Sequence, residues 1–164
     1  YAETWAREHG GQVLFVATAQ AFDDEMRERI ARHRAERPSN WQTLEAPLAT
    51  GKAVREALQA SAFDVVLLDC ITLLASNILL SLPDACTQDD VSAAILVEID
   101  SLLDTIAQSD ATWLMVSNEV GMGIVPPTRL GRFYRDGLGR ANQRFAQAAH
   151  QVLLLVAGLP WALK

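Results

Sequence analysis

Asp64-Val65-Val66-Leu67-Leu68-Asp69 places four consecutive apolar residues between two acids, and this stretch decides the fold class. An apolar run of this length without alternation is typical of a strand that is buried on both faces. Gln12 to Ala17 and Thr112 to Ser117 are two more runs of the same kind. Because helix-length segments separate these runs, the sequence predicts an α/β fold with a mostly parallel central sheet and helices on both faces.

Capping and turn residues mark the other elements. Asp23 and Asp24 start a predicted helix that ends near Glu36, since Pro38 forbids a helical residue before it. Thr87-x-x-Asp90 resembles a capping box. The helix expected at 128–149 contains three glycines, so either a neighbour approaches it closely or it breaks. The remaining predictions are helices at 1–10, 51–60 and 70–80, a helix after Thr87, strands at 41–45 and 151–156, loops at 81–89 and 118–127, a turn at 158–160 and a terminal strand at 161–163.

Composition excludes several classes of protein. The 164 residues carry 14 basic and 20 acidic side chains, for a net charge of -6, and 50% are hydrophobic. These values favour one folded domain over a disordered chain, and the apolar runs are too short for a membrane span. Cys70 and Cys86 have no metal-binding spacing, and no secretory leader is visible, so a reduced, cytoplasmic chain fits best. The first predicted helix lacks a cap and an initiator Met, which leads us to expect a natural beginning outside this sequence.

Ten of the twelve arginines lie in two stretches, 27–37 and 129–144. Because guanidinium groups suit phosphate and carboxylate, two clusters in an acidic protein favour defined anion sites over a broad nucleic-acid surface. The first stretch contains Glu28 and Glu36 and closely follows Glu25, and a solvated helix with charge pairs is the favoured interpretation there. The second stretch has a single acid, Asp136, and leaves a solvated face, an anionic ligand and an acidic partner surface open.

Residues that directly follow the strands are the first candidates for a site, since ligands of parallel sheets bind beyond the carboxyl ends of the strands. Asp69 ends an apolar strand, as does the acid that holds Mg²⁺ in P-loop nucleotide enzymes. An N-cap role for the next helix explains Asp69 equally well. Glu45 and Glu119 could bind a ribose, a base edge or Mg²⁺, although solvation is the default for both.

His33 continues the inward stripe of its helix, which Phe22, Met26 and Ile30 mark at four-residue steps. Arginines on either side of His33 in the sequence are expected to disfavour its cationic form, which leaves a neutral ring nitrogen for attack on phosphorus. The alternative is a packed or solvent-facing histidine, and the residues by themselves favour that alternative. His9 and His150 are interpreted as structural.

Several motifs, taken together, resemble one enzyme family. They are Val16-Ala-Thr-Ala-Gln20 with Asp23-Asp-Glu-Met26; Arg29-Ile30 with His33, Arg37-Pro38 and Trp41; Leu67-Leu-Asp-Cys-Ile-Thr72; Ser117 to Pro126; and Gly139-Arg140 with Asn142-Gln143. In this order and spacing the chain resembles the bifunctional adenosylcobinamide kinase/adenosylcobinamide-phosphate guanylyltransferase family of cobalamin biosynthesis. Members of that family begin with a strand and a glycine-rich P-loop containing Arg-Ser-Gly-Lys-Ser, and Tyr1-Ala2-Glu3 resembles the residues that follow this loop. We therefore expect the N-terminal strand and P-loop to be missing from this sequence.

The resemblance implies a single-domain, P-loop NTPase (RecA-like) fold and two reactions. ATP or GTP phosphorylates a hydroxyl of adenosylcobinamide. GTP then transfers GMP to an enzyme histidine with release of pyrophosphate, and GMP passes from the histidine to adenosylcobinamide phosphate to give adenosylcobinamide-GDP. By motif position the histidine is His33, and Asp69 would hold Mg²⁺. The positions implied in nucleotide binding are Ala17, Thr18, Ala19, Arg34, Ala35, Glu36, Arg37, Glu45 and Asp69.

Two of these positions depart from the family pattern. Ala19 stands where members often have Ser, so a hydroxyl contact is lost, and Asp69 stands where they often have Glu, so the carboxylate is one methylene shorter. The resemblance further implies a homo-oligomer, a trimer in this family, with no nucleic-acid partner. Two alternatives remain open: another P-loop nucleotide kinase or NTPase with a different acceptor, and a non-catalytic module that binds nucleotide or holds subunits together.

Overall fold

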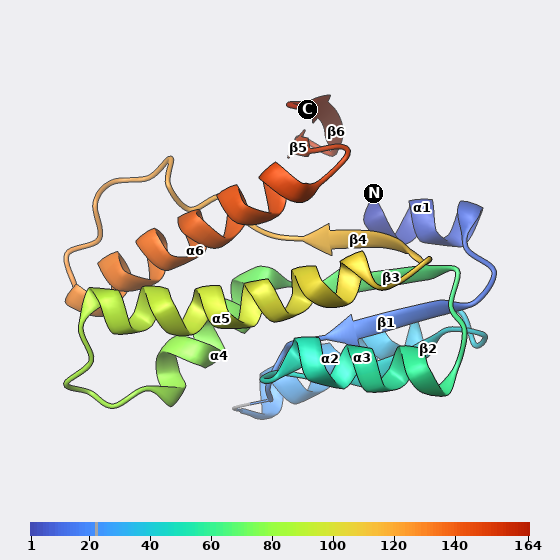
Figure 1. The fold of residues 1–164 in the computed structure, drawn as a ribbon, viewed down its shortest axis with the longest axis horizontal. Coiled ribbons are helices and arrows are strands. Elements are labelled where there is room, and N and C mark those ends of the chain that lie inside the picture. The colour runs from blue at the N-terminus through green and yellow to red at the C-terminus, as the bar shows by residue number, and fades with distance from the viewer. Residues whose placement is uncertain (22) are drawn as a thin grey trace.

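The computed structural model describes residues 1–21 and 23–164. Phe22, which the sequence placed on the inward stripe of its helix, lies outside the described residues. Helices and strands alternate along most of the chain (Figure 1). The elements are α1 (Ala2–His9), β1 (Val13–Ala17), α2 (Asp24–Ala35), β2 (Gln42–Glu45), α3 (Thr50–Ala60), β3 (Val65–Asp69), α4 (Ile71–Ser81), α5 (Gln88–Ala107), β4 (Thr112–Val116), α6 (Arg129–Ala148), β5 (Leu153–Val156) and β6 (Leu159–Ala162).

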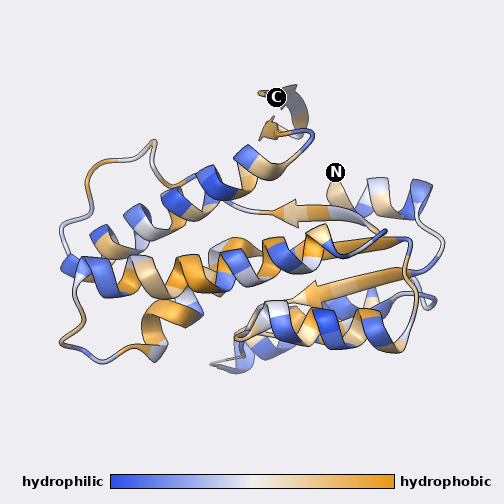
Figure 2. Cartoon of the chain, viewed as in Figure 1, coloured by the Kyte–Doolittle hydropathy of each residue, from blue (hydrophilic) through white to orange (hydrophobic). Residues whose placement is uncertain are grey.

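The central sheet has four parallel strands in the order β2-β1-β3-β4. Its two middle strands, β1 and β3, are the apolar runs from which the fold class was predicted, and they are buried along almost their whole length. Figure 2 shows both strands as largely hydrophobic. Polar residues are absent from these runs because both faces of the middle strands pack against other elements. The predicted α/β class is confirmed.

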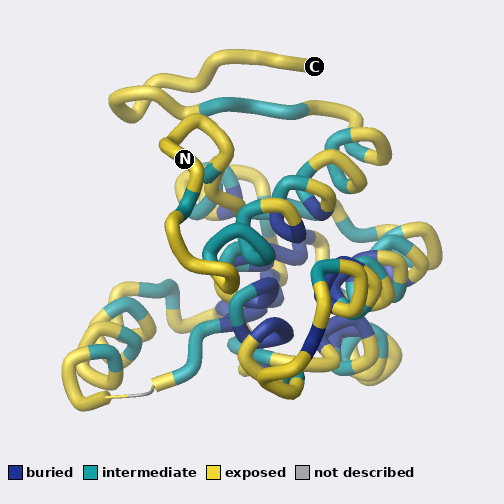
Figure 3. The backbone as a smooth tube through the Cα atoms, turned by 90° about the vertical axis from the view of Figure 1, so that its left-hand side faces the viewer, coloured by how far each residue is buried: buried dark blue, intermediate teal, exposed yellow. Residues whose placement is uncertain are grey.

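Alternate residues of the middle strands enter two separate cores, one on each face of the sheet. Leu14, Val16, Val66 and Leu68 join side chains of α3, α4, α5 and α6 in the larger core. The odd-numbered neighbours of these residues face the opposite core, which includes Ala6 of α1 and Trp41. Figure 3 shows buried segments in the interior and exposed helices outside them. The prediction of helices on both faces is therefore confirmed, with unequal coverage of the two faces.

Predicted helix boundaries agree with the capping contacts. Asp23 accepts a hydrogen bond from the backbone N–H of Met26 at the start of α2, and Thr87 and Asp90 form the reciprocal capping box of α5. Helix α6 is continuous despite its glycines. One of them, Gly137, allows a close approach, since a Cβ there would lie 2.6 Å from the Cδ1 atom of Ile95 on α5.

The C-terminal strands differ from the prediction. β5 begins at Leu153 and pairs with β6 as an antiparallel hairpin that is separate from the central sheet. The turn is formed by Ala157 and Gly158, with φ values of 52° and 78°, and not by residues 158–160. Positive φ at both central residues is typical of a type I′ two-residue hairpin turn. With Ala157 and Gly158 in the turn, β6 starts two residues earlier than expected.

Among residues 1–21 and 23–164, no helix is both long enough and apolar enough to span a membrane. Cys70 and Cys86 are both buried, and neither forms a disulfide.

Candidate functional site

Three predicted site residues meet at the carboxyl edge of the sheet. Ala17 pairs with Glu45 on one side and with Asp69 on the other. These are the last residues of β1, β2 and β3, and parallel strands that end in register bring their ends together. The predicted position of the site at this edge is consistent with that register.

Thr18 ties the loops at this edge together. Its side chain is fully buried, and its hydroxyl donates to the carbonyl of Cys70 at 2.7 Å and accepts from the N–H of Cys70 at 2.9 Å. Buried Asn77 of α4 donates from Nδ2 to the carbonyls of Thr18 at 2.8 Å and Pro47 at 3.0 Å. The loops that follow β1, β2 and β3 are thus fixed against α4, and the hydroxyl of Thr18 is engaged within the fold.

His33 points from α2 toward the same edge. Met26, Ile30, His33 and Arg37 are half-buried, whereas their described neighbours on α2 are exposed, so His33 does lie on the inward stripe. Its Nε2 atom lies 3.1 Å from Oε1 of Glu3 and 3.8 Å from Oδ2 of Asp69.

Arginines were expected around the ring of His33. At Nε2 this expectation is wrong, because the charged groups in contact with this nitrogen are carboxylates. Residues adjacent in a helix point in different directions, so the side chains of Arg32 and Arg34 diverge from the side chain of His33. Both arginines are exposed.

The other predicted positions on α2 lie around the end of this helix. Nη1 of Arg34 lies 3.4 Å from Oε1 of Glu45, which brings two predicted nucleotide-binding residues together. Arg37 stacks over Phe15 at 3.5 Å from the ring centroid and donates to Oγ1 of Thr43 at 3.3 Å. Among the described residues its Nε has no hydrogen-bond partner, and burial lowers the pKa of Arg37. Ala35 ends α2 and Glu36 caps it, both exposed, and Ala19 is half-buried in the loop after β1.

Asp69 is the carboxylate whose titration the site perturbs most clearly. Burial raises the pKa of Asp69, while His33 and Arg37 act in the opposite direction and Glu3 adds to the rise. Desolvation of the ionised carboxylate therefore outweighs the attraction of the nearby cationic groups. An ionised Asp69 weakens the fold, which is common for residues that serve a site and not the core.

Replacing Asp69 with asparagine should raise the melting temperature at neutral pH by a few degrees. The folded-state pKa of Asp69 lies above its unfolded value, so its contribution to stability is present below the unfolded pKa and is lost as pH rises through the folded pKa. The gain of Asp69→Asn should accordingly shrink toward zero when the pH falls below about 4. Thermal unfolding from pH 3 to 8, without nucleotide or divalent metal, measures this difference. An equal or lower melting temperature at neutral pH would contradict the sign.

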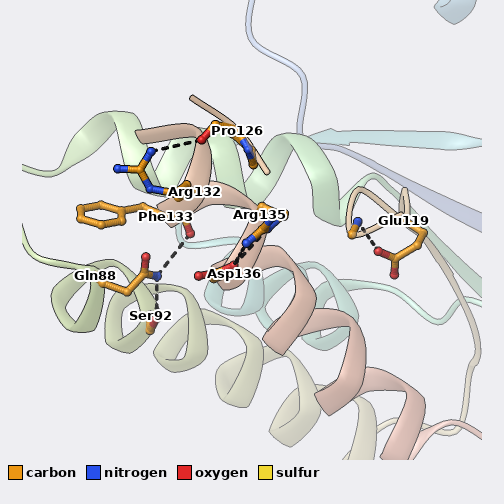
Figure 4. A network of polar contacts seen from close by, with 9 residues as sticks. Gln88, Ser92, Glu119, Pro126, Arg132, Phe133, Arg135 and Asp136 are labelled. Atoms are coloured by element: carbon orange, nitrogen blue, oxygen red, sulfur yellow. Dashed lines mark hydrogen bonds and ion pairs between the residues drawn. The ribbon is translucent and has the colours of Figure 1, made fainter. Parts of the chain in front are cut away.

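The loop after β4 is joined to α4 and α6 by a polar network. Thr72 donates to Oδ1 of Asn118 at 2.9 Å and accepts from the backbone N–H of Asn118 at 2.8 Å. Asn142 of α6 donates to the carbonyl of Asn118 at 3.1 Å, and Ser117 donates to Oδ1 of Asn142 at 2.7 Å. Residues from three of the family-like motifs therefore lie together. Glu119, a lesser candidate, bonds locally to the N–H of Gly121 (Figure 4).

Most of the second arginine cluster is engaged within the chain. Arg132 donates to the carbonyls of Pro126 at 3.1 Å and Pro127 at 2.9 Å, and Arg135 pairs with Asp136 (Figure 4). Arg129 donates to the carbonyl of Cys86, and Arg144 pairs with Asp100 at 3.0 Å. Four of the five arginines in 129–144 therefore have partners within the chain.

Two surface cavities lie away from the carboxyl edge of the sheet. One, of about 520 Å³, is lined by Leu82, Pro83, Ala85, Cys86, Asp90 and Ala93. The other, of about 310 Å³, lies between α3 and α5 and includes Arg55 and Phe63. Neither is lined by a predicted site residue, so the candidate site is the open edge around His33 and Asp69.

Sequence analysis missed two residues of this region. Glu3 contacts His33 but lies on another helix, thirty positions earlier, where no local pattern connects the two. Asn77 interrupts a largely apolar helix that carries buried residues on several sides. A buried polar residue in such a helix needs hydrogen-bond partners, and this requirement could have drawn attention to Asn77.

Comparison with known proteins covers nearly the whole chain. A family model described as cobinamide kinase / cobinamide phosphate guanyltransferase matches residues 1–163. The chain is 40% identical over 153 residues to the bifunctional adenosylcobalamin biosynthesis protein CobU of Escherichia coli K12, which covers 90% of this chain and 83% of the relative. The protein CobU of Salmonella typhimurium LT2 gives the same identity and coverage.

A third relative is the bifunctional adenosylcobalamin biosynthesis protein CobP of Pseudomonas aeruginosa PAO1. It is 41% identical over 163 residues, which cover 99% of this chain and 88% of the relative. The similarity therefore extends over every element of the fold and includes both sides of the candidate site.

Proposed function

The chain belongs to the cobinamide kinase / cobinamide phosphate guanyltransferase family, and we propose that it catalyses both reactions of a bifunctional enzyme of cobalamin biosynthesis. In the first, ATP or GTP phosphorylates adenosylcobinamide. In the second, GMP is transferred from GTP to adenosylcobinamide phosphate, which gives adenosylcobinamide-GDP. The proposal is supported by identities of 40% or more to relatives named as bifunctional adenosylcobalamin biosynthesis proteins, each matched over most of its length.

His33 is the nucleophile of the second reaction in this proposal. The observation that carries it is the position of the imidazole, which extends from the half-buried stripe of α2 to the carboxyl edge of the sheet beside Asp69. Its side chain is 40% exposed, so a nucleotide bound at this edge can reach it. An imidazole can attack the α-phosphorus of GTP, and a covalent intermediate divides one difficult transfer into two easier ones.

The residues around His33 supply groups that suit a guanine nucleotide. Arg34 and Glu45 lie side by side at the open edge and offer a cation for phosphate and a carboxylate for a ribose or base edge. Arg37 places a second guanidinium at the end of α2. Ala17, Thr18 and Ala19 lie at the end of β1 and in the loop after it, and Ala35 and Glu36 lie at the end of α2. We assign these positions to nucleotide binding.

Asp69 fits the role of a Mg²⁺ ligand. Its carboxylate is 34% exposed at the end of β3, and oxygen is the donor that Mg²⁺ prefers. The raised pKa of Asp69 shows that the cationic groups beside it do not fully offset the cost of burying its charge. When bound, Mg²⁺ would neutralise charge on the nucleotide phosphates. Asp69 would hold that ion, and His33 lies close enough to Asp69 to act on the same nucleotide.

We further propose that the protein is cytoplasmic and that it forms a homo-oligomer, a trimer. The C-terminal hairpin supports association with another chain, because several large apolar side chains are exposed on this small sheet. Exposed apolar groups of this kind are typical of surfaces that bind another chain. They are Leu155, Val156, Leu159, Trp161 and Leu163. Light scattering coupled to size-exclusion chromatography measures the number of subunits directly.

The experiment that tests the function supplies both substrates to the full natural protein. Adenosylcobinamide, ATP or GTP, and Mg²⁺ are incubated with the enzyme, and the corrinoid products are identified by mass spectrometry. We expect adenosylcobinamide phosphate with either nucleotide and adenosylcobinamide-GDP only when GTP is present. Nucleotide hydrolysis without a corrinoid product would instead identify another P-loop NTPase, and binding without turnover would identify a non-catalytic module.

A further inference from the structure

Glu3 and His33 connect two helices at the edge of the sheet. Oε1 of Glu3, on α1, lies 3.1 Å from Nε2 of His33, on α2. Asp69 is farther from the same nitrogen, at 3.8 Å. Within the described part of the chain, the ligand atoms of these three side chains all lie within 4.8 Å of one another. Nε2 of His33 therefore faces two carboxylates.

The position of Glu3 is fixed by its own helix. Ala6, one turn later on α1, is fully buried, and α1 packs against β3. Arg7 lies 3.8 Å from Glu3 and donates a hydrogen bond to the carbonyl of Glu36 at the end of α2, at 3.1 Å. Helix α1 thus contacts the region of His33 at two points, which keeps the carboxylate of Glu3 in place beside the imidazole.

Phe15 restrains the imidazole from another direction. The rings of Phe15 and His33 meet edge to face, with centroids 5.8 Å apart and planes at 73°. Phe15 is only 1% exposed on β1, so its ring does not move aside freely. With Phe15 against the ring and Glu3 beside Nε2, the two nitrogens of His33 have different surroundings.

This difference decides which nitrogen can act as the nucleophile. A neutral imidazole has one N–H and one nitrogen with a lone pair. Carboxylate oxygens at 3.1 and 3.8 Å repel a lone pair on Nε2 and attract a hydrogen there. The hydrogen therefore belongs on Nε2, and the lone pair belongs on Nδ1. Partner groups on one ring nitrogen commonly set the tautomer in this way.

On the basis of the proposed guanylyl transfer, we propose that Glu3 is a positioning residue that holds the hydrogen of His33 on Nε2 and so directs GMP onto Nδ1. The lone pair of Nδ1 forms the bond to the α-phosphorus of GTP. The bond from that phosphorus to the oxygen that bridges to the β-phosphate breaks, and its electron pair leaves with pyrophosphate. The hydrogen stays on Nε2, and the carboxylate of Glu3 stabilises the positive charge that the ring acquires.

The first test determines which ring nitrogen carries GMP. Full-length natural protein with ¹⁵N-labelled histidine is treated with GTP and Mg²⁺, and long-range ¹H–¹⁵N NMR of the adduct distinguishes Nδ1 from Nε2. We expect the adduct on Nδ1 of His33. An adduct on Nε2 overturns the role of Glu3 while it supports the proposed function. No adduct on any histidine overturns the guanylyl-histidine step, and the role of Glu3 falls with it.

The second test removes the charge of Glu3 with little change in shape. Glu3→Gln should slow single-turnover adduct formation by about 10- to 100-fold, the range found when a partner of a functional histidine is lost. The dissociation constant for GTP should stay within about twofold of the unchanged protein, because Glu3 acts on His33 and not on the nucleotide. The matched control is Glu8→Gln, on the exposed side of the same helix, which should leave both values unchanged. An unchanged rate in Glu3→Gln would overturn the proposal.

Discussion

Replacing His33 with alanine should abolish covalent labelling of the protein by α-phosphate-labelled GTP, with a loss of at least about 10³-fold in guanylyl transfer. The imidazole is the group that forms the bond to phosphorus, and removal of a covalent nucleophile costs enzymes several orders of magnitude in rate. Alanine offers no atom that could replace it. The measurement is intact mass spectrometry after incubation with GTP and Mg²⁺, followed by peptide mapping of the adduct.

The same substitution should leave the fold and the first reaction in place. His33 is 40% exposed on a helix that buries no residue among those described, so its loss should change the free energy of unfolding by about 1 kcal/mol or less. Phosphorylation of adenosylcobinamide should continue, since it needs no histidine adduct. His150→Ala, at an exposed histidine far along the chain, is the matched control and should be labelled normally. Normal labelling of His33→Ala would exclude His33 as the nucleophile.

Replacing Asn77 with leucine should lower the free energy of unfolding by about 2–4 kcal/mol. Leucine has the same number of side-chain heavy atoms as asparagine but no donor for the carbonyls of Thr18 and Pro47. Both hydrogen bonds are lost, and the carbonyl of Thr18 stays in a buried environment without Nδ2 as its partner. Urea denaturation measures the change. Guanylyl transfer should also fall, because Thr18 and Pro47 belong to the loops that follow β1 and β2.

Asn40→Leu is the matched control for this effect. Asn40 is exposed and donates one longer hydrogen bond, 3.3 Å, to the carbonyl of Gly11. Its substitution should change the free energy of unfolding by about 0.5 kcal/mol or less. Equal effects of the two substitutions would show that the buried hydrogen bonds of Asn77 do not hold the loops of the site.

Local patterns were sufficient for most of the fold. The apolar runs that became β1 and β3 identified the middle of a parallel sheet, because strands covered on both faces carry few polar residues. The box formed by Thr87 and Asp90 located the start of α5, because the groups that cap a helix are close in sequence. The hairpin turn was misplaced, since Gly158 and Pro160 indicated a turn but the positive φ at Ala157 is not favoured by alanine.

In the candidate site, too, local sequence patterns predicted some features, and contacts between distant elements decided the others. The sequence by itself determined that His33 lies on the inward face of its helix and that Asp69 ends a buried strand, because helix periodicity and apolar runs are local properties. Only the tertiary structure decided that Glu3 joins them and that carboxylates, not arginines, contact Nε2. Residues 3, 33 and 69 belong to three elements, and their meeting depends on how α1 and α2 pack at the edge of the sheet. No short-range pattern in the chain encodes that packing.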